Sequence, residues 1–150
     1  MAKLNRIDTQ IVEILQENAR LTNADLARQL DVSEATVRRH IDKLLEQDVI
    51  RIKAVADPFK LGYVVIVIVG LWVDKIHLRE AEEYLCALPE VRFVGVTMGS
   101  YDLMLEAWFR SREAMVQFMT DTLAAVPGIG RSDSFQVMRL SKYTYDWGKP

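Results

Sequence analysis

The longest apolar run of the chain, LGYVVIVIVGLWV at residues 61–73, constrains its fold more than any other segment. The run is too short to cross a bilayer and is rich in β-branched side chains, so it predicts a buried strand. Both faces of this strand are apolar. Val65, Val67, Val69 and Leu71 lie on one side, and Tyr63, Val64, Ile66, Ile68 and Trp72 complete the apolar set. A strand buried on both sides needs a second partner, and no other segment is left to supply one. We therefore expect a homodimer in which two sheets pack together.

The rest of the second half alternates strands with amphipathic helices. Strands are predicted at 63–73, 91–98, 102–109 and 129–141, and helices at 76–88 and 111–125. Pro89 and the pair Pro127-Gly128 end the two helices, because proline cannot continue a helix and glycine favours its end. The residues expected to face inward are Ala81, Tyr84, Leu85 and Leu88 in the first helix and Met115, Phe118, Met119 and Leu123 in the second. This order is the βαββαβ arrangement of ferredoxin-like domains.

Residues 1–54 follow a different pattern, in which charged and apolar residues alternate at helical spacing. Three helices are predicted: one with the stripe Ile7, Ile11, Ile14 and Leu15, one capped by Thr22 or Asn23 with Leu26, Ala27 and Leu30 inward, and one that begins at Ser33. The turn at Asp31 has helix-turn-helix spacing, and aspartate tolerates the left-handed backbone that such a turn needs. The following VIRIKAVA alternates like a strand and predicts the wing of a winged fold.

The composition changes near VADPFKLG, where Asp57-Pro58 and Gly62 are turn residues. We expect a winged helix-turn-helix domain at 1–54, a linker or hinge at 55–62 and a ferredoxin-like domain at 63–150. The predicted fold class is therefore α+β.

The third helix carries the residues that indicate nucleic-acid binding. With Val37, Ile41 and Leu44 inward and Ser33 as the cap, the opposite side presents Ala35, Thr36, Arg39 and Lys43, flanked by Arg38 and His40. Arginine reads guanine edges in the major groove, threonine and alanine approach thymine methyl groups, and lysine meets phosphate. The helix therefore predicts binding to double-stranded DNA, and a dimer would suit a palindromic operator. The alternative is that this basic face is only a solvated surface.

Composition argues against several other classes. The net charge of −2 means that any DNA-binding surface is local, which disfavours a packager that depends on a large basic surface. The start MAKLNRIDTQ lacks the apolar core of a signal peptide, and the single Cys86 is expected to be an inert core thiol in a cytoplasmic protein. The only histidines, His40 and His77, lie in different halves, and the sequence contains no metal-ligand cluster, phosphate loop or nucleophile–base set. We expect neither an enzyme nor a cofactor.

Together these residues resemble the Lrp/AsnC family, the leucine-responsive and asparagine-responsive, or feast/famine, regulators. The resemblance covers nearly the whole chain and rests on features that occur together: Leu-x-x-Ile-Asp at 4–8, Asn-Ala-Arg at 18–20, the helix begun by Ser33, Pro-x-x-Leu-Gly at 58–62 and the βαββαβ half. Asp31 and Asp48 depart from it, since the family typically has glycine at both helix ends, and we expect a small cost in stability there. The alternatives are an architectural DNA-binding protein without effector and an enzyme like the sirohaem decarboxylases, which share the family's outline.

The resemblance implies a transcriptional regulator whose second half forms dimers, assembles further into tetramers of dimers, and binds an amino acid or a similar small molecule as effector. The implied effector site lies between dimers at the loop Gly99-Ser100-Tyr101-Asp102, with Met98 before it and Ser132 and Ser134 from the last strand. Backbone N–H groups and Ser100 would hold a carboxylate, Asp102 would pair with an ammonium group, and Tyr101 would wall the pocket. The alternative is a plain hairpin in which Asp102 caps backbone N–H groups.

Overall fold

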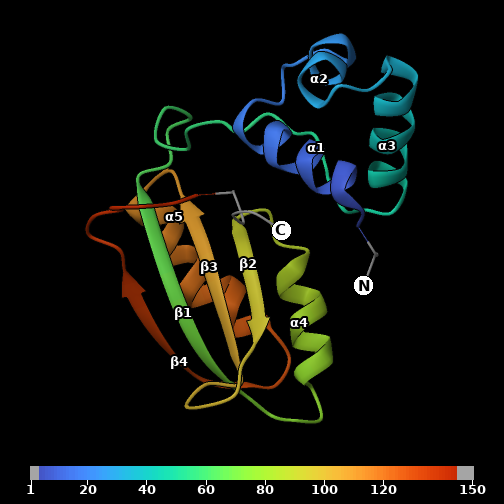
Figure 1. The fold of residues 1–150 in the computed structure, drawn as a ribbon. Coiled ribbons are helices and arrows are strands. Elements are labelled where there is room, and N and C mark those ends of the chain that lie inside the picture. Colours follow the sequence, from blue (N-terminus) through green and yellow to red (C-terminus); the bar gives the residue numbers. More distant parts are fainter. Residues whose placement is uncertain (1–3, 145–150) are drawn as a thin grey trace. The chain divides into compact units, whose positions relative to one another are not determined.

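In the computed structural model, which describes residues 4–144, the chain forms two compact units (Figure 1). Of the described residues, the first unit contains 4–55 together with 142–144, and the second contains 56–141. The first unit is helical, and the second is built on an antiparallel sheet.

Three helices form the first unit: α1 (Arg6–Glu17), α2 (Asn23–Leu30) and α3 (Glu34–Glu46). Each helix is preceded by an N-cap residue, and the N-caps are Asn5, Thr22 and Ser33. The side chain of each N-cap accepts a hydrogen bond from the backbone N–H of the residue three positions later. Asn5 and Thr22 belong to complete capping boxes, because an aspartate at the third helical position bonds back to the N-cap backbone. The sequence therefore specifies the start of each helix locally.

The apolar stripes of the three helices meet in one core, whose buried residues are Ile11, Val12, Leu26, Ala27, Val37 and Leu44. The predicted turn between α2 and α3 is confirmed, since Asp31 adopts the left-handed conformation with φ 53° and ψ 48°. Asp48, after α3, also has a positive φ of 52°. Both aspartates thus hold the backbone conformation for which glycine is usual.

The strand predicted for VIRIKAVA at residues 49–56 is not formed. Val49 and Ile50 pack against the helical core, whereas residues 51–57 are exposed and lack regular secondary structure. A strand needs a partner for its backbone N–H and C=O groups, and this unit has no second strand within residues 4–144. The alternating pattern therefore belongs to an exposed connection.

The second unit is a four-stranded antiparallel sheet with helices packed on one face (Figure 1). Its elements are β1 (Val65–Val73), α4 (Leu78–Cys86), β2 (Val91–Val96), β3 (Leu103–Phe109), α5 (Arg112–Gln117) with a π turn at Phe118–Thr122 and a 3₁₀ turn at Leu123–Ala125, and β4 (Ile129–Gln136). The spatial order β2-β3-β1-β4 places β1 inside the sheet. The predicted α+β class and βαββαβ order are confirmed.

The helix-covered face of the sheet contains the main core of this unit. From β1 it buries Val65, Val67, Val69 and Leu71, and from the helices Ala81, Leu85, Phe118 and Leu123. Two residues of α4 differ from expectation, because Tyr84 is 40% exposed and the Cys86 thiol is exposed rather than in the core. Cys86 follows the buried Leu85 by one residue, which turns it about 100° away from the inward stripe.

The opposite face of the sheet, here called the outer face, is partly covered within a single chain. Ile66 is 5% exposed and lies opposite Trp108 of β3. Farther along β1, the Tyr101 ring lies over Gly70, where an added Cβ would come within 2.5 Å of the ring. The expectation that no segment remained to cover the second face of β1 is therefore wrong at these two positions.

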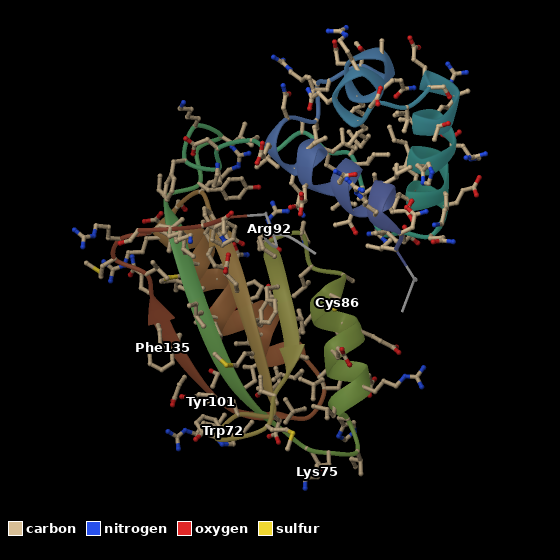
Figure 2. All side chains as sticks on the ribbon, in the orientation of Figure 1. Trp72, Lys75, Cys86, Arg92, Tyr101 and Phe135 are labelled. Atoms are coloured by element: carbon tan, nitrogen blue, oxygen red, sulfur yellow. The ribbon has the colours of Figure 1, made fainter. Side chains whose placement is uncertain are left out.

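The middle of the outer face is more open. Ile68 is half-buried there. It belongs to a row of paired residues across the four strands, in the order Phe93 of β2, Glu106 of β3, Ile68 of β1 and Phe135 of β4. Phe93 is 55% exposed and Phe135 is 53% exposed; the Phe135 side chain stands out from β4 in Figure 2. Two exposed aromatic rings thus bracket the centre of this face.

Residues 57–63 form a turn that is fastened to the sheet rather than an open hinge. The Asp57 carboxylate accepts the Phe59 N–H at 3.0 Å, and the Val64 N–H donates to the Phe109 carbonyl at 2.9 Å. The ring of Tyr63 has the guanidinium carbons of Arg92 and Arg110 5.6 and 4.9 Å from its centroid. The exposed connection is therefore residues 51–56, and most of the predicted hinge is part of the second unit.

Candidate nucleic-acid interface and ligand loop

The exposed side of α3 presents a shallow surface that carries three basic and two acidic side chains. Its hollow is lined by Ala35, Arg38, Arg39, Asp42, Lys43 and Glu46. Arg38 and Arg39 are exposed, and neither makes an ion pair with any residue that the structure describes. Two guanidinium groups on one helix face, with all their N–H donors available, can contact base edges and phosphates. This surface is called the α3 face below.

Ser33 and Thr36 are occupied by the start of the helix. The Ser33 hydroxyl accepts the Thr36 N–H at 3.2 Å, and the two hydroxyl oxygens lie 2.9 Å apart in a second hydrogen bond. Ser33 is exposed and Thr36 is half-buried, whereas Ala35 is exposed. These residues shape the end of the α3 face more than they add free polar groups to it.

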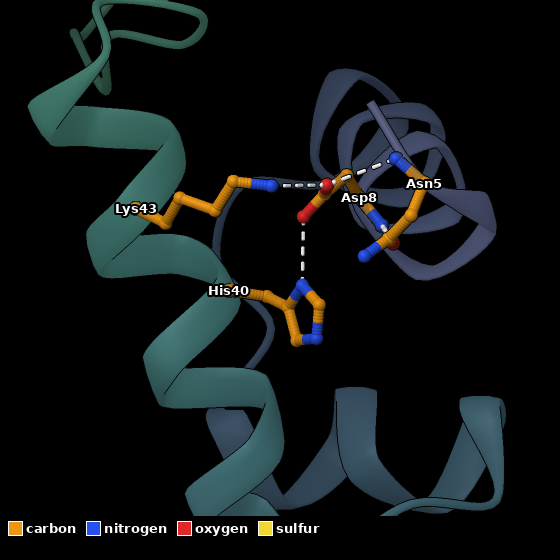
Figure 3. A network of polar contacts seen from close by, with 4 residues as sticks. All are labelled: Asn5, Asp8, His40 and Lys43. Carbon is orange, nitrogen blue, oxygen red and sulfur yellow. Dashed lines mark hydrogen bonds and ion pairs between the residues drawn. The ribbon is translucent and has the colours of Figure 1, made fainter. Parts of the chain in front are cut away.

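His40 does not flank the α3 face as the sequence predicted. It is 8% exposed, and its Nδ1 lies 2.7 Å from Asp8 Oδ1 of α1 (Figure 3). Helical angles set it beside the face, but the side chain turns inward because a buried carboxylate lies there. Asp8 was not among the predicted functional residues, and its position in the Leu-x-x-Ile-Asp segment was the only available indication of a role.

Lys43 takes the other oxygen of the same carboxylate. Its Nζ lies 2.7 Å from Asp8 Oδ2, while its side chain remains 37% exposed and contributes to the hollow of the α3 face (Figure 3). Lys43 therefore lies at the edge of the exposed face, as predicted, but its charge is already balanced by Asp8. One aspartate of α1 therefore holds two residues of α3 that lie one turn apart.

Asp8 is fully buried and makes four hydrogen bonds. Besides His40 and Lys43, its Oδ2 accepts the Asn5 N–H at 3.0 Å, and its own N–H donates to Asn5 Oδ1 at 2.9 Å. Burial raises the pKa of this carboxyl, but the Asn5 N–H, the Lys43 ammonium and His40 lower it more, and the result is a pKa of about 2 instead of 3.8. Asp8 is therefore ionised at neutral pH, so His40 Nδ1 is the donor in their hydrogen bond.

The loop between β2 and β3 closes as a short hairpin. The Thr97 N–H donates to the Asp102 carbonyl at 3.0 Å, and the Thr97 hydroxyl donates to the Tyr101 carbonyl at 2.6 Å. Gly99 has φ 146°, a conformation that favours glycine, and nothing lies within 4 Å of its missing Cβ. Met98, Gly99 and Ser100 are exposed. The tip of the loop is therefore accessible to a ligand.

Asp102 bonds to the end of β1. Its Oδ2 accepts the Val73 N–H at 3.0 Å, next to the register shift between Trp72 and Val73. Its own N–H donates to the Leu71 carbonyl at 2.9 Å. The alternative in which Asp102 caps a backbone N–H thus describes its contacts in this structure, and the residue is half-buried with one carboxylate oxygen turned to this role.

Tyr101 lies on the outer face of the sheet, in contact with residues that the sequence did not indicate. Its hydroxyl donates to Asp133 Oδ2 at 3.2 Å, and its ring meets Trp72 edge-on with centroids 4.7 Å apart. The Arg131 guanidinium lies over the Trp72 ring, with its central carbon 4.3 Å from the ring centroid. Burial and the Asp133 carboxylate raise the pKa of the Tyr101 phenol.

Ser132 and Ser134 are not brought together with Tyr101. In β4 they pair with Leu71 and Val69, which face the helices, whereas Asp133 pairs with Gly70 on the outer face. Side chains alternate along a strand, so the two serines and Asp133 point to opposite sides. Within one chain, Asp133 is thus the β4 residue beside Tyr101, and the alternation of side chains along the strand would have indicated it.

Within residues 4–144, no cluster of three or more histidine, cysteine or acidic residues could hold a metal ion. None of the helices described is long and apolar enough to cross a membrane.

Comparison with protein-family models gives one match for each half of the chain. Residues 4–51 match a winged helix-turn-helix DNA-binding model, and residues 66–147 match the Lrp/AsnC ligand-binding domain. The second match covers more than half of the sequence, and the two matches together account for nearly all of it.

Individual proteins agree with the family models. An HTH-type transcriptional regulator of Pyrococcus furiosus is 31% identical over 143 residues, covering 95% of this chain and 97% of that protein. A transcriptional regulator of Neisseria meningitidis, solved in complex with L-Met, superimposes with a TM-score of 0.86 at 26% identity and covers 95% of each chain. The AsnC structure of E. coli has a TM-score of 0.90 at 24% identity, with 99% and 100% of the two chains covered, and supports the fold.

Proposed function

The chain belongs to the Lrp/AsnC family of helix-turn-helix transcriptional regulators, and from this membership we propose that it reads operator DNA through the α3 face and responds to an amino acid. The observation that carries the DNA-reading role is the pair of exposed, unpaired arginines Arg38 and Arg39 beside Ala35 on α3. Small and basic side chains on one exposed helix suit the major groove.

The test of DNA reading is selection of duplexes from a random library by the purified full-length chain. A sequence-specific regulator enriches a defined site, and a dimer enriches one with two-fold symmetry. An architectural DNA-binding protein would enrich no sequence and would bind with a steep salt dependence. Failure to enrich any sequence therefore rejects sequence-specific reading but leaves non-specific binding to be measured directly.

The amino-acid response is proposed for the loop at 97–102. Support comes from the exposed Met98, Gly99 and Ser100, from the Asp102 carboxylate beside them, and from the related regulator that was solved with L-Met. Backbone N–H groups of the loop suit a ligand carboxylate, and Asp102 suits an ammonium group. A thermal-shift screen against the amino acids tests this, since a ligand that binds only the folded state raises the melting temperature.

We further propose that the outer face of the sheet forms the homodimer contact. Phe93 and Phe135 expose apolar area on either side of the half-buried Ile68, and apolar surface gathered on one face favours association. A dimer would present two α3 faces to a palindromic operator. The effector loop adjoins the same sheet, which makes ligand-dependent assembly of such dimers the expected route of regulation.

A further inference from the structure

The Lys43 ammonium has two competing uses. It lies 2.7 Å from the buried Asp8 carboxylate, yet its side chain is 37% exposed at the edge of the α3 face. A DNA phosphate in contact with this face would carry the same charge as Asp8 and would attract the same ammonium group. Lysine suits such an exchange because its charge sits on a flexible four-carbon stem.

Asp8 cannot lose Lys43 without compensation. The carboxylate is fully buried, and a buried charge left without a counter-charge is strongly disfavoured. Two partners would remain, the Asn5 N–H on Oδ2 and His40 on Oδ1. Of these only the imidazole can acquire a positive charge, and histidine is the side chain whose protonation changes most readily near neutrality.

Among the ion pairs within residues 4–144, none other than those with His40 and Lys43 includes Asp8. Asp8 is the only ion-pair partner of His40 within residues 4–144. On α1, Arg6 and Glu17 are exposed and Glu13 is half-buried without an ion pair, and on α2, Asp25 and Arg28 pair with each other. His40 is therefore the one bonded partner of Asp8, other than Lys43, that can supply a positive charge.

We propose that Asp8 and His40 are positioning residues for DNA binding, in which a DNA phosphate takes the Lys43 ammonium from Asp8 and His40 takes up one proton to balance the carboxylate left behind. The step forms a Lys43–phosphate ion pair, breaks the Lys43–Asp8 pair and adds one proton to the His40 imidazole. It rests on the DNA-reading role of the α3 face proposed above. Affinity for DNA then rises as the pH falls toward neutrality from above, because binding consumes a proton.

The experiment measures proton uptake on binding. Full-length protein is titrated with DNA by calorimetry at pH 7–8 in phosphate and in Tris, whose ionisation enthalpies differ, so that the difference in heat counts protons. The probes are the duplex recovered by selection and an unrelated duplex at low salt, since phosphate contacts do not depend on sequence. The parent is expected to take up a fraction of one proton per α3 bound, with both duplexes.

Two variants and a matched control decide the origin of the proton. In His40→Asn, an amide N–H replaces the Nδ1 donor toward Asp8 but cannot be protonated, so proton uptake should vanish. Lys43→Met keeps the stem without the charge, and it should abolish uptake and reduce the salt slope of binding by about one. His77→Asn, in the second unit, should bind and take up protons as the parent does. Circular dichroism confirms that each variant is folded.

Absence of proton uptake in the parent, or its persistence in Lys43→Met or His40→Asn, overturns the proposal. This failure is distinct from failure of the DNA-reading role. If the parent binds DNA without proton uptake and Arg39→Ala weakens that binding, the α3 face still reads DNA and only the exchange at Asp8 is wrong. If the parent binds no DNA, both proposals fall.

Discussion

Asp8 shows how much a single side chain contributes where it is buried and fully bonded. Its folded pKa of about 2 lies below the ordinary 3.8, so its ionised form stabilises the folded state. That stability is complete above about pH 4 and is lost as the pH falls through about 2, because protonation then costs the folded state its ion pair. We expect a loss of about 2 kcal/mol across this window.

The measurement is chemical denaturation of the helical unit between pH 5 and pH 2, followed by circular dichroism. Asp8→Asn should be less stable than the parent at pH 5, and the gap should narrow toward pH 2. Asp42→Asn, an exposed residue of α3, serves as the control and should follow the parent throughout. A gap between parent and Asp8→Asn that does not change with pH would contradict the assignment.

Arg39 is the residue of the α3 face from which we expect the clearest effect on sequence reading. Its exposed guanidinium makes no ion pair with a described residue, so its donors are available to a base edge. Arg39→Ala should weaken binding to the selected operator by about 1–3 kcal/mol and relax preference at one base position. Arg79 is an exposed arginine of α4 that pairs with Glu83, and Arg79→Ala is the control for loss of one charge. It should leave operator affinity and base preference unchanged.

The turn between α2 and α3 tests stability at the scale of an element. Asp31 holds φ 53°, which strains most L-residues and suits glycine. Asp31→Gly should raise the free energy of unfolding by about 0.5–1 kcal/mol, net of the greater entropy of glycine in the unfolded chain. Asp31→Ala, which has neither the freedom of glycine nor the local bonding of aspartate, should lower it. Denaturation curves in which both variants shift in the same direction would reject this account.

In the loop between β2 and β3, the Asp102 carboxylate holds the end of β1 and is also proposed to bind a ligand ammonium group. Asp102→Asn retains an oxygen that can accept the Val73 N–H, so the loop should keep its shape while losing its charge. If the carboxylate also binds a ligand ammonium group, effector affinity should fall by roughly 1.5–3 kcal/mol. Calorimetric titration with the amino acid found in the thermal-shift screen measures this. Equal affinity of parent and folded variant would leave Asp102 with its structural bond alone.

For the whole molecule, the outer face predicts how copies associate. Phe135→Lys places a charge at a residue that is 53% exposed in one chain, so the variant should fold and yet lose the sheet-to-sheet contact. Val116→Lys, at a residue of α5 that is 47% exposed, adds the same charge on the helical side and should leave assembly unchanged. Sedimentation should show a dimer or larger species for the parent and for Val116→Lys, and a monomer for Phe135→Lys. A parent that sediments as a monomer at micromolar concentration refutes the contact.

The amino-acid sequence by itself determined the order of the helices and strands apart from the wing strand, whereas several predicted ends differ, as in β4, which ends at Gln136 and not at 141. The helix starts at Asn5, Thr22 and Ser33 and the left-handed turn at Asp31 depend on bonds within a few residues, so local spacing is enough to predict them. The buried core face of β1 and the βαββαβ order follow from periodicity alone. The resemblance to the Lrp/AsnC family, carried by motifs along nearly the whole chain, was sufficient for the family assignment.

Only the tertiary structure decided which distant residues meet. Asp8 and Lys43 are 35 positions apart, and Tyr101 and Asp133 are 32 apart, so no local pattern pairs them. Local pattern also failed for the predicted wing strand, whose residues alternate as a strand does but have no partner strand among the described residues of their unit. It failed likewise for Ser132 and Ser134, because their register against β1 decides which face of the sheet they lie on. Periodicity tells on which side of its own element a residue lies, whereas a contact depends on which element is folded against that side.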